Sequence, residues 1–190
     1  MIKTRRCHCR SWLITLALLW SLIACLPAAA DTTERFVGTV LFMRHALAPG
    51  FGDPDHFSIK DCNTQRNLDE TGRAQARAIG AKLAAVDIKF SAIYSSYWCR
   101  CLETAELLGL GTVIPFEGLN SFFQNHAPQE ATLAKLRQKL NSLSPSAPGS
   151  LMVTHSVTIR AITGISVESG GMVIYDLKTG TARELSLLSL

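Results

Sequence analysis

Beyond its first 30 residues, the sequence has no excess of charge of either sign. Four of the 19 basic residues and none of the 15 acidic residues lie in residues 1–30, so 15 of each remain in the rest of the chain. A chain with this balance has no basic face of the kind that binds a nucleic-acid backbone. We therefore expect no nucleic acid among its partners.

The sequence also has few cysteines outside its N-terminal segment, and it has no internal repeat or low-complexity tract. Cys62, Cys99 and Cys101 are the three that remain after residue 30. A structural zinc site needs more ligands than these, and the Cys99-x-Cys101 spacing is tighter than the gap of about two to four residues that such sites use. We expect no metal and, in an oxidising compartment, a disulfide from Cys62 to either Cys99 or Cys101.

Long apolar runs are absent except near the N-terminus. There a basic start precedes an apolar run over residues 12–23, which is short for a membrane-spanning helix, and small residues follow up to Ala30. This layout is typical of a secretory signal peptide. We predict a signal peptide over residues 1–30 and one domain over residues 31–190, exported to the periplasm. In the alternative, residues 22–25 resemble a lipobox, and a lipidated Cys25 would anchor the protein to the membrane.

Apolar and β-branched segments alternate along the chain with segments of helical periodicity. Strands are expected at 39–44, 92–95, 112–115 and 151–154, and helices at 71–86, 100–108, 130–143 and 157–163. Residues 172–177 and 183–188 flank a glycine-containing loop and are predicted to form a hairpin. The alternation predicts an α/β fold, a three-layer α/β/α sandwich with a mostly parallel sheet. Residues 46–66 form a long loop of the kind that carries function.

Two histidines stand where buried strands are expected to end. His45 follows the strand at 39–44, and His155 follows the strand at 151–154. The strand ends of an open α/β sheet meet at a crevice where ligands bind. Arg44 precedes the first histidine, and Arg100 follows the strand at 92–95. Two arginines and two histidines in these places predict a pocket for an anionic phosphate, with an imidazole available to attack it.

These residues belong to four motifs that resemble those of the histidine phosphatase (phosphoglycerate mutase-like) superfamily. Residues 44–46 resemble its Arg-His-Gly signature, with Ala46 in place of the glycine, and residues 68–76 resemble its first-helix motif. Residues 95–105 and 153–155 resemble its second-arginine and second-histidine motifs. The resemblance implies a phosphoglycerate mutase-like fold and a small exported bacterial member of this superfamily.

The resemblance also implies an activity, the hydrolysis of phosphate monoesters without a metal or cofactor. His45 would be the nucleophile and would form a phosphohistidine intermediate. Arg44 and Arg100 would bind the phosphate and hold His45 neutral, and His155 would stabilise the phosphate oxygens. The expected partner is a phosphorylated small-molecule substrate.

The acid that protonates the leaving group is less apparent. Where the family has Leu-x-Glu, residues 119–121 of this chain read Leu-Asn-Ser. Glu117 is the nearest carboxylate and our first candidate, and Asp53 and Asp55 in the long loop are its rivals. Two alternative functions follow. One is a phosphomutase of the same superfamily, which the short chain and its export disfavour; the other is a non-catalytic module that binds a phosphorylated ligand but lacks the acid.

Overall fold

The computed structural model describes residues 36–186 of the chain. The predicted signal peptide and the lipidation candidate Cys25 lie outside the described residues, so both stay predictions. Within residues 36–186, no helix is long and apolar enough to cross a membrane.

The described residues build a six-stranded mixed sheet in the order β3-β2-β4-β1-β5-β6. Strands β3, β2, β4 and β1 run parallel, whereas β5 pairs antiparallel with β1, and β6 pairs antiparallel with β5. The predicted α/β fold is confirmed, and its C-terminal hairpin makes the sheet mixed. The strands are β1 (Thr39–Arg44), β2 (Ala92–Ser95), β3 (Val113–Pro115), β4 (Ser150–Thr154), β5 (Met172–Asp176) and β6 (Ala182–Leu185).

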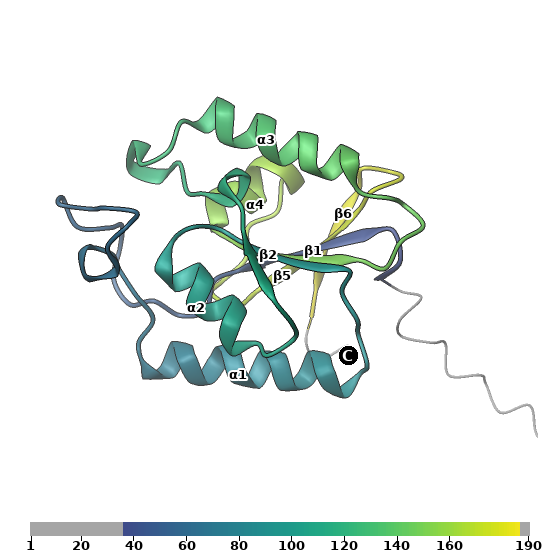
Figure 1. The fold of residues 1–190 in the computed structure, drawn as a ribbon, viewed down its shortest axis with the longest axis horizontal. Coiled ribbons are helices and arrows are strands. Elements are labelled where there is room, and N and C mark those ends of the chain that lie inside the picture. The colour runs from purple at the N-terminus through teal and green to yellow at the C-terminus, as the bar shows by residue number, and fades with distance from the viewer. Residues whose placement is uncertain (1–35, 187–190) are drawn as a thin grey trace, which may run out of the picture. The chain divides into compact units, whose positions relative to one another are not determined.

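Helices cover both faces of this sheet, as Figure 1 shows, which confirms the three layers. Helices α1 (Glu70–Ala85) and α2 (Cys99–Leu107) lie on one face, and α3 (Gln129–Ser142) and α4 (Ser156–Thr163) lie on the other. Asp69 caps α1, because its side chain accepts a hydrogen bond from the Gly72 N–H at 2.7 Å. Three short 3₁₀ helices lie in the connections: η2 (Cys62–Thr64), η3 (Glu117–Leu119) and η4 (Phe123–Asn125).

The side chains of β1 alternate between two hydrophobic cores. Leu41 and Met43 pack with residues of α1 and α2, whereas Val40 and Phe42 pack with residues of α3 and α4. Successive side chains of a strand point to opposite faces, so a strand covered on both sides reads as a continuous apolar run. The run that predicted this strand therefore also places β1 inside the sheet, where both layers support its C-terminal end.

The strand order gathers the predicted site residues at one edge of the sheet. Strands β1 and β4 are parallel neighbours, with Arg44 opposite Thr154, so His45 and His155 follow them at the same edge. Strand β2 is the other neighbour of β4, and the loop from β2 leads into α2, which carries Arg100. Residues 45, 100 and 155 thus meet although 55 residues separate each from the next.

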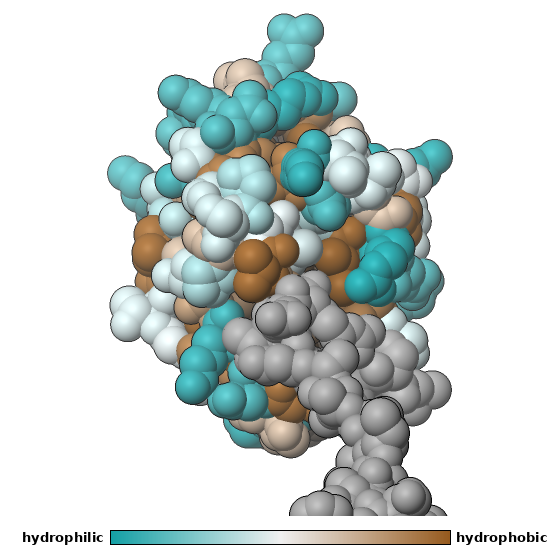
Figure 2. Space-filling model, turned by 90° about the vertical axis from the view of Figure 1, so that its right-hand side faces the viewer, coloured by the Kyte–Doolittle hydropathy of each residue, from teal (hydrophilic) through white to brown (hydrophobic). Residues whose placement is uncertain are grey.

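Few large hydrophobic side chains of the described residues are exposed. In the side view of Figure 2, hydrophobic residues form separate patches with hydrophilic residues between them. Single exposed hydrophobic residues are normal on a folded domain. The exposed ones are Val37, Phe51, Tyr97, Ile114 and Phe123. Of these, Phe51 and Phe123 share one pocket.

Candidate active site

A pocket of about 190 Å³ opens at the ends of β1 and β4. The structure brings four of the predicted site residues to its wall: Arg44, His45, Arg100 and His155. The other residues that line it are Gly50, Phe51, Gly52, Arg66, Ser121, Phe123, Ser156 and Val157.

His45 presents an unprotonated nitrogen toward Arg100. Its Nδ1 lies 2.7 Å from the carbonyl oxygen of Ala46, which can only accept, so Nδ1 carries the hydrogen and donates it. Nε2 then keeps a lone pair, and Arg100 Nε donates to it at 3.2 Å. Burial and, second, the charge of Arg100 lower the pKa of His45 to about 3. The ring is therefore neutral near pH 7, and burial contributes more to this than either of the arginines named from the sequence.

Ala46 occupies the place of the family's glycine without a left-handed backbone, since its φ is not positive. Its methyl group is fully buried, and its N–H donates to Thr104 Oγ1 at 3.0 Å. The Thr104 hydroxyl donates in turn to the Arg100 carbonyl at 2.6 Å. The threonine of the second-arginine motif thereby links the end of β1 to α2.

The first-helix motif holds the chain just after His45. Gln75 Oε1 accepts the Leu47 N–H at 2.8 Å, and Gln75 Nε2 donates to the Ser169 carbonyl at 2.9 Å. A Cβ at Gly72 would lie 1.9 Å from the Leu47 carbonyl oxygen, so the close approach of α1 requires glycine. The motif therefore positions the segment that follows the histidine.

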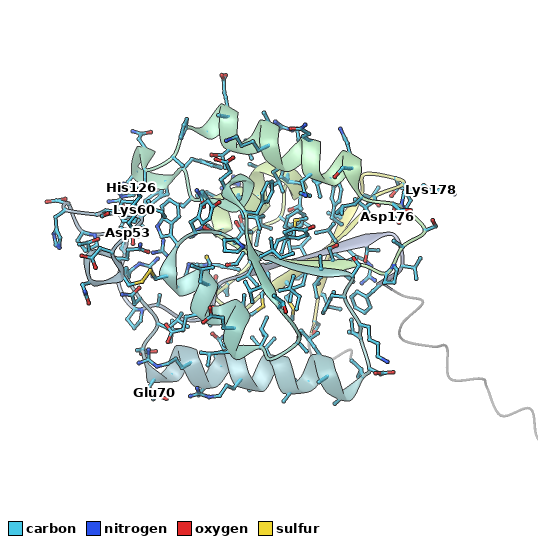
Figure 3. All side chains as sticks on the ribbon, viewed as in Figure 1. Asp53, Lys60, Glu70, His126, Asp176 and Lys178 are labelled. Atoms are coloured by element: carbon cyan, nitrogen blue, oxygen red, sulfur yellow. A yellow bond between two sulfur atoms is a disulfide. The ribbon has the colours of Figure 1, made fainter. Side chains whose placement is uncertain are left out.

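Arg100 is held by a buried carboxylate that the sequence offered as a proton donor. Asp53, which Figure 3 labels on the side of the long loop, accepts two hydrogen bonds from the guanidinium at 2.7 and 3.1 Å. It also accepts the Arg66 N–H and the Trp98 indole N–H, both at 3.0 Å. Burial raises the pKa of Asp53, but the hydrogen bonds and charge of Arg100 outweigh it and leave this pKa below its ordinary value. Asp53 is thus an ionised partner that positions Arg100.

Arg66 is a third arginine at the pocket that the sequence analysis did not predict. Its Nε donates to the Gly52 carbonyl at 2.8 Å, and its Nη1 donates to the Ala48 carbonyl. Burial and, second, repulsion from Arg100 lower its pKa. In the sequence Arg66 is one charged residue among several in a long loop, and no local signal separates it from them.

The pocket carries an excess of positive charge. Three arginines line the pocket, and the buried carboxylate beside them is Asp53. Glu168 lies 3.9 Å from Arg44, but its side chain is fully exposed, so its charge is screened and offsets little of theirs. Arg44 Nη1 donates to the Val167 carbonyl at 3.1 Å, but its buried Nε has no partner within residues 36–186. An unpaired buried donor is costly, so this pocket favours an anion with several acceptor oxygens.

His155 is also buried and neutral. Its Nε2 lies 3.0 Å from the Ser96 hydroxyl and 3.5 Å from the Cys101 sulfur. Its ring packs edge-on against the rings of His45 and Trp98, with centroids 5.5 and 5.1 Å away. Burial and, second, the charge of Arg100 keep its pKa well below the usual value. His155 can therefore offer one N–H donor but no charge.

The structure does not place Glu117, our first choice of proton donor, among the residues that line this pocket. Within η3, Gly118 and Leu119 are buried, whereas the Glu117 side chain is 51% exposed and its carboxylate pairs with Lys135 of α3. Asp55 is exposed and does not line the pocket either. The buried Ser121, at the family's acid position, does line it.

A disulfide joins Cys62 to Cys99, which decides between the two pairings left open by the sequence. It ties the long loop to the first residue of α2, next to Arg100. Cys101 stays free and buried, and burial raises the pKa of its thiol to about 12.

Comparison with known proteins agrees with these motifs. Residues 40–122, which include Arg44, His45 and Arg100, match the model of the histidine phosphatase superfamily (branch 1). No curated protein matches the sequence significantly.

Solved structures share the fold at low sequence identity. The protein histidine phosphatase SixA complexed with tungstate is 15% identical, covers 78% of this chain and 94% of its own, and has a TM-score of 0.53. The putative phosphohistidine phosphatase SixA from Agrobacterium tumefaciens is 19% identical, with coverages of 80% and 97% and a TM-score of 0.53. A mutant phosphoserine phosphatase from Entamoeba histolytica in complex with phosphoserine is 17% identical, with coverages of 78% and 95% and a TM-score of 0.52. Over residues 40–122 the chain is thus similar to the histidine phosphatase superfamily, and its described residues share the fold of these solved structures.

Proposed function

We propose that this protein is a metal-independent phosphatase that hydrolyses phosphate monoesters through a phosphohistidine on His45. The observation that carries the proposal is the buried, neutral His45, whose Nε2 keeps a lone pair beside a group of arginines. Two solved structures of this fold support a phosphorylated small-molecule substrate, since one holds tungstate and another holds phosphoserine.

Substrate binding would use the positive charge of the pocket. A phosphate monoester is a dianion near pH 7, and guanidinium groups bind its oxygens through paired, charge-assisted hydrogen bonds. Arg44 lines the pocket, and its Nε has no hydrogen-bond partner among the described residues. Arg100 Nε would turn its hydrogen bond from His45 Nε2 to the phosphate, which frees the lone pair of the nucleophile.

In the first chemical step, His45 Nε2 forms a bond to phosphorus while the bond from phosphorus to the leaving oxygen breaks. The imidazole becomes positive as it is phosphorylated, and the hydrogen bond from Nδ1 to the Ala46 carbonyl stabilises that charge. Water then attacks phosphorus, the N–P bond breaks, and His45 returns to its neutral form.

His155 would stabilise the transferring phosphoryl group. The Ser96 hydroxyl has one hydrogen and lies near two acceptors, Asn120 Oδ1 at 3.2 Å and His155 Nε2 at 3.0 Å. We propose that it donates to His155 Nε2, the shorter of the two contacts. In that arrangement the hydrogen of the neutral ring is on Nδ1, from which it can donate to a phosphoryl oxygen.

A second candidate function is a non-catalytic module that binds a phosphorylated ligand. It is favoured by one observation: no Asp or Glu of the described chain lines the pocket, so no carboxylic acid is placed to protonate a leaving group. The mutase alternative has no such observation in its favour.

Phosphorylation of His45 distinguishes these functions. The purified protein is mixed with acetyl phosphate or phenyl phosphate, quenched without acid and analysed by mass spectrometry, and free phosphate is measured in parallel. We expect phosphate on His45, its loss in His45→Ala, and unchanged turnover in His56→Ala, which alters an exposed histidine of the same loop. Full activity of His45→Ala would refute the mechanism. Tight phosphate binding without turnover would establish the binding module, and isomerised product without free phosphate would establish a mutase.

We also propose that the protein is exported to the periplasm. The signal-peptide layout of residues 1–30 supports this, as does the Cys62–Cys99 disulfide, because disulfides persist in oxidising compartments. The intact mass of the protein purified from fractionated cells tests it. A chain that begins at Asp31 would confirm cleavage after Ala30, a lipidated Cys25 would establish the anchored alternative, and an uncleaved cytoplasmic chain would refute export.

A further inference from the structure

Two phenylalanine rings form an aromatic rim at the mouth of the pocket. Phe51 comes from the long loop and Phe123 from η4, and their centroids lie 5.2 Å apart in an edge-to-face arrangement. Phe51 is 89% exposed and Phe123 is 38% exposed, yet both line the same pocket as His45. Exposed apolar surface beside a pocket marks a site that a ligand covers.

The backbone on both sides of the rim is held in unusual conformations. Gly50 and Gly52, which flank Phe51, have φ values of 92° and 70°. Gln124, which follows Phe123, has a φ of 57°, and a non-glycine residue adopts this region at a cost. Its side-chain amide accepts the Asp53 N–H at 2.8 Å and donates to the Asp53 carbonyl at 3.4 Å. These hydrogen bonds join the two loops that carry the rings, and they do so at Asp53, the residue that positions Arg100.

The same pocket lacks a group able to protonate a leaving oxygen. No carboxylate of the described chain lines it, and the oxygens of the nearby Asp53 accept four hydrogen bonds. His45 and His155 are neutral near pH 7. A leaving group must then depart as a weakly basic anion. A phenolate meets this condition, with a conjugate-acid pKa of about 10, whereas an alkoxide is far more basic, about as basic as hydroxide.

We propose that the substrate is an aryl phosphate, whose aromatic leaving group packs against Phe51 and Phe123 while its phosphoryl group meets the arginines. This inference rests on the proposed phosphatase function. The His45 Nε2–P bond forms as the P–O bond to the ring breaks, and the phenolate leaves with the electron pair. Water then releases phosphate from His45, and the proton that the water loses balances the phenolate, so phenol and inorganic phosphate result. The uncharged rim and a pocket of about 190 Å³ fit a small apolar ring.

Three phosphates that differ in their ring and in their leaving group test this inference on the full-length protein. Phenyl phosphate has a ring and a good leaving group, cyclohexyl phosphate has a ring and a poor one, and acetyl phosphate has a good leaving group and no ring. We expect kcat/KM for phenyl phosphate to exceed that for cyclohexyl phosphate by at least about a thousandfold, because the leaving oxygens differ greatly in basicity. O-phosphotyrosine, tested free and within a peptide, distinguishes a small-molecule source from a protein source.

Variants of the rim test the contact with the ring. Phe51→Ala and Phe123→Ala should each lower the ratio of kcat/KM for phenyl phosphate to that for acetyl phosphate by about three- to tenfold, the size of an aromatic pair interaction. The control is Ile114→Ala, an exposed hydrophobic residue on β3 away from the pocket, which should leave the ratio unchanged.

Equal losses on both substrates in the rim variants would overturn the inference, as would turnover of cyclohexyl phosphate at the rate of phenyl phosphate. Turnover of acetyl phosphate without that of phenyl phosphate would overturn the inference but leave the proposed phosphatase in place. Failure to turn over any of these phosphates would overturn both.

Discussion

Asp53→Asn should destabilise the protein strongly, because it removes the charge that faces buried Arg100 while keeping the size of the side chain. The guanidinium and the carboxylate are each 4% exposed, and they are joined at 2.7 Å. Asparagine replaces one oxygen with an NH₂ group, which can only donate. At the Oδ2 position that group faces two donors, Arg100 Nη2 and the indole N–H of Trp98.

The magnitude follows from the burial of the pair. Removing one partner of a buried ion pair costs about 3–5 kcal/mol, because the remaining charge is left uncompensated. The asparagine oxygen at the Oδ1 position still accepts from the Arg66 N–H and from Arg100 Nη1, so we expect the lower end of this range, about 3 kcal/mol. For a domain of this size that loss lowers Tm by about 6–12 °C.

Thermal unfolding followed by circular dichroism at pH 7, with and without inorganic phosphate, measures this effect. Phosphate should raise the Tm of Asp53→Asn more than that of the unsubstituted protein, because the arginine has lost its internal counter-charge. The control, Asp55→Asn, changes an exposed residue of the same loop and should alter stability by less than about 0.5 kcal/mol. Wild-type stability and turnover in Asp53→Asn would refute the idea that this carboxylate positions Arg100.

Three further predictions follow from the site. Native His45 stays neutral down to about pH 3, whereas an unfolded histidine binds a proton near pH 6.5, so the free energy of unfolding falls as the pH drops through this window. Between pH 7 and pH 5, urea unfolding should show that this free energy falls by about 2 kcal/mol less in His45→Asn than in the unsubstituted protein. Cys62→Ser should lower the free energy of unfolding by about 2–4 kcal/mol and make Tm insensitive to reductant, and a Tm that reductant leaves unchanged in the unsubstituted protein would contradict the disulfide. Gly72→Ala should cost about 3 kcal/mol or more, because its Cβ would meet the Leu47 carbonyl, whereas Gly109→Ala, with open space around it and a φ of 66°, should cost about 1–2 kcal/mol; similar unfolding free energies for the two would refute the close approach of α1.

Much of the fold could be predicted because its signals are local. The apolar run at 39–44 identified β1, since a strand buried on both faces needs apolar side chains at every position. The helix ends also have local causes, because the Asp69 side chain caps α1 and Gly109, with a φ of 66°, follows α2. Even the C-terminal hairpin, β5 and β6, was predicted from its turn and flanking strands.

The candidate site also has a part that local sequence signals predicted and a part that only the structure supplied. Arg44, His45, Arg100 and His155 were predicted because each stands in a motif at the end of a strand or the start of a helix. The structure brings them to one pocket because β1 and β4 are parallel neighbours. Their chemical roles stay predictions until His45 is tested for phosphate.

By itself, the sequence determined the alternation of strands and helices and the positions of both histidines at strand ends, because short-range periodicity and turn chemistry encode these features. Only the tertiary structure decided which charged side chains face the pocket. Glu117 turned toward Lys135, Asp53 became the partner of Arg100, and Arg66 reached the pocket wall. Loop side chains have no periodicity that reveals their direction, and their charges are positioned by partners far away in the chain. Three-dimensional packing alone could therefore show an arginine-lined pocket whose wall, among residues 36–186, contains no carboxylic acid.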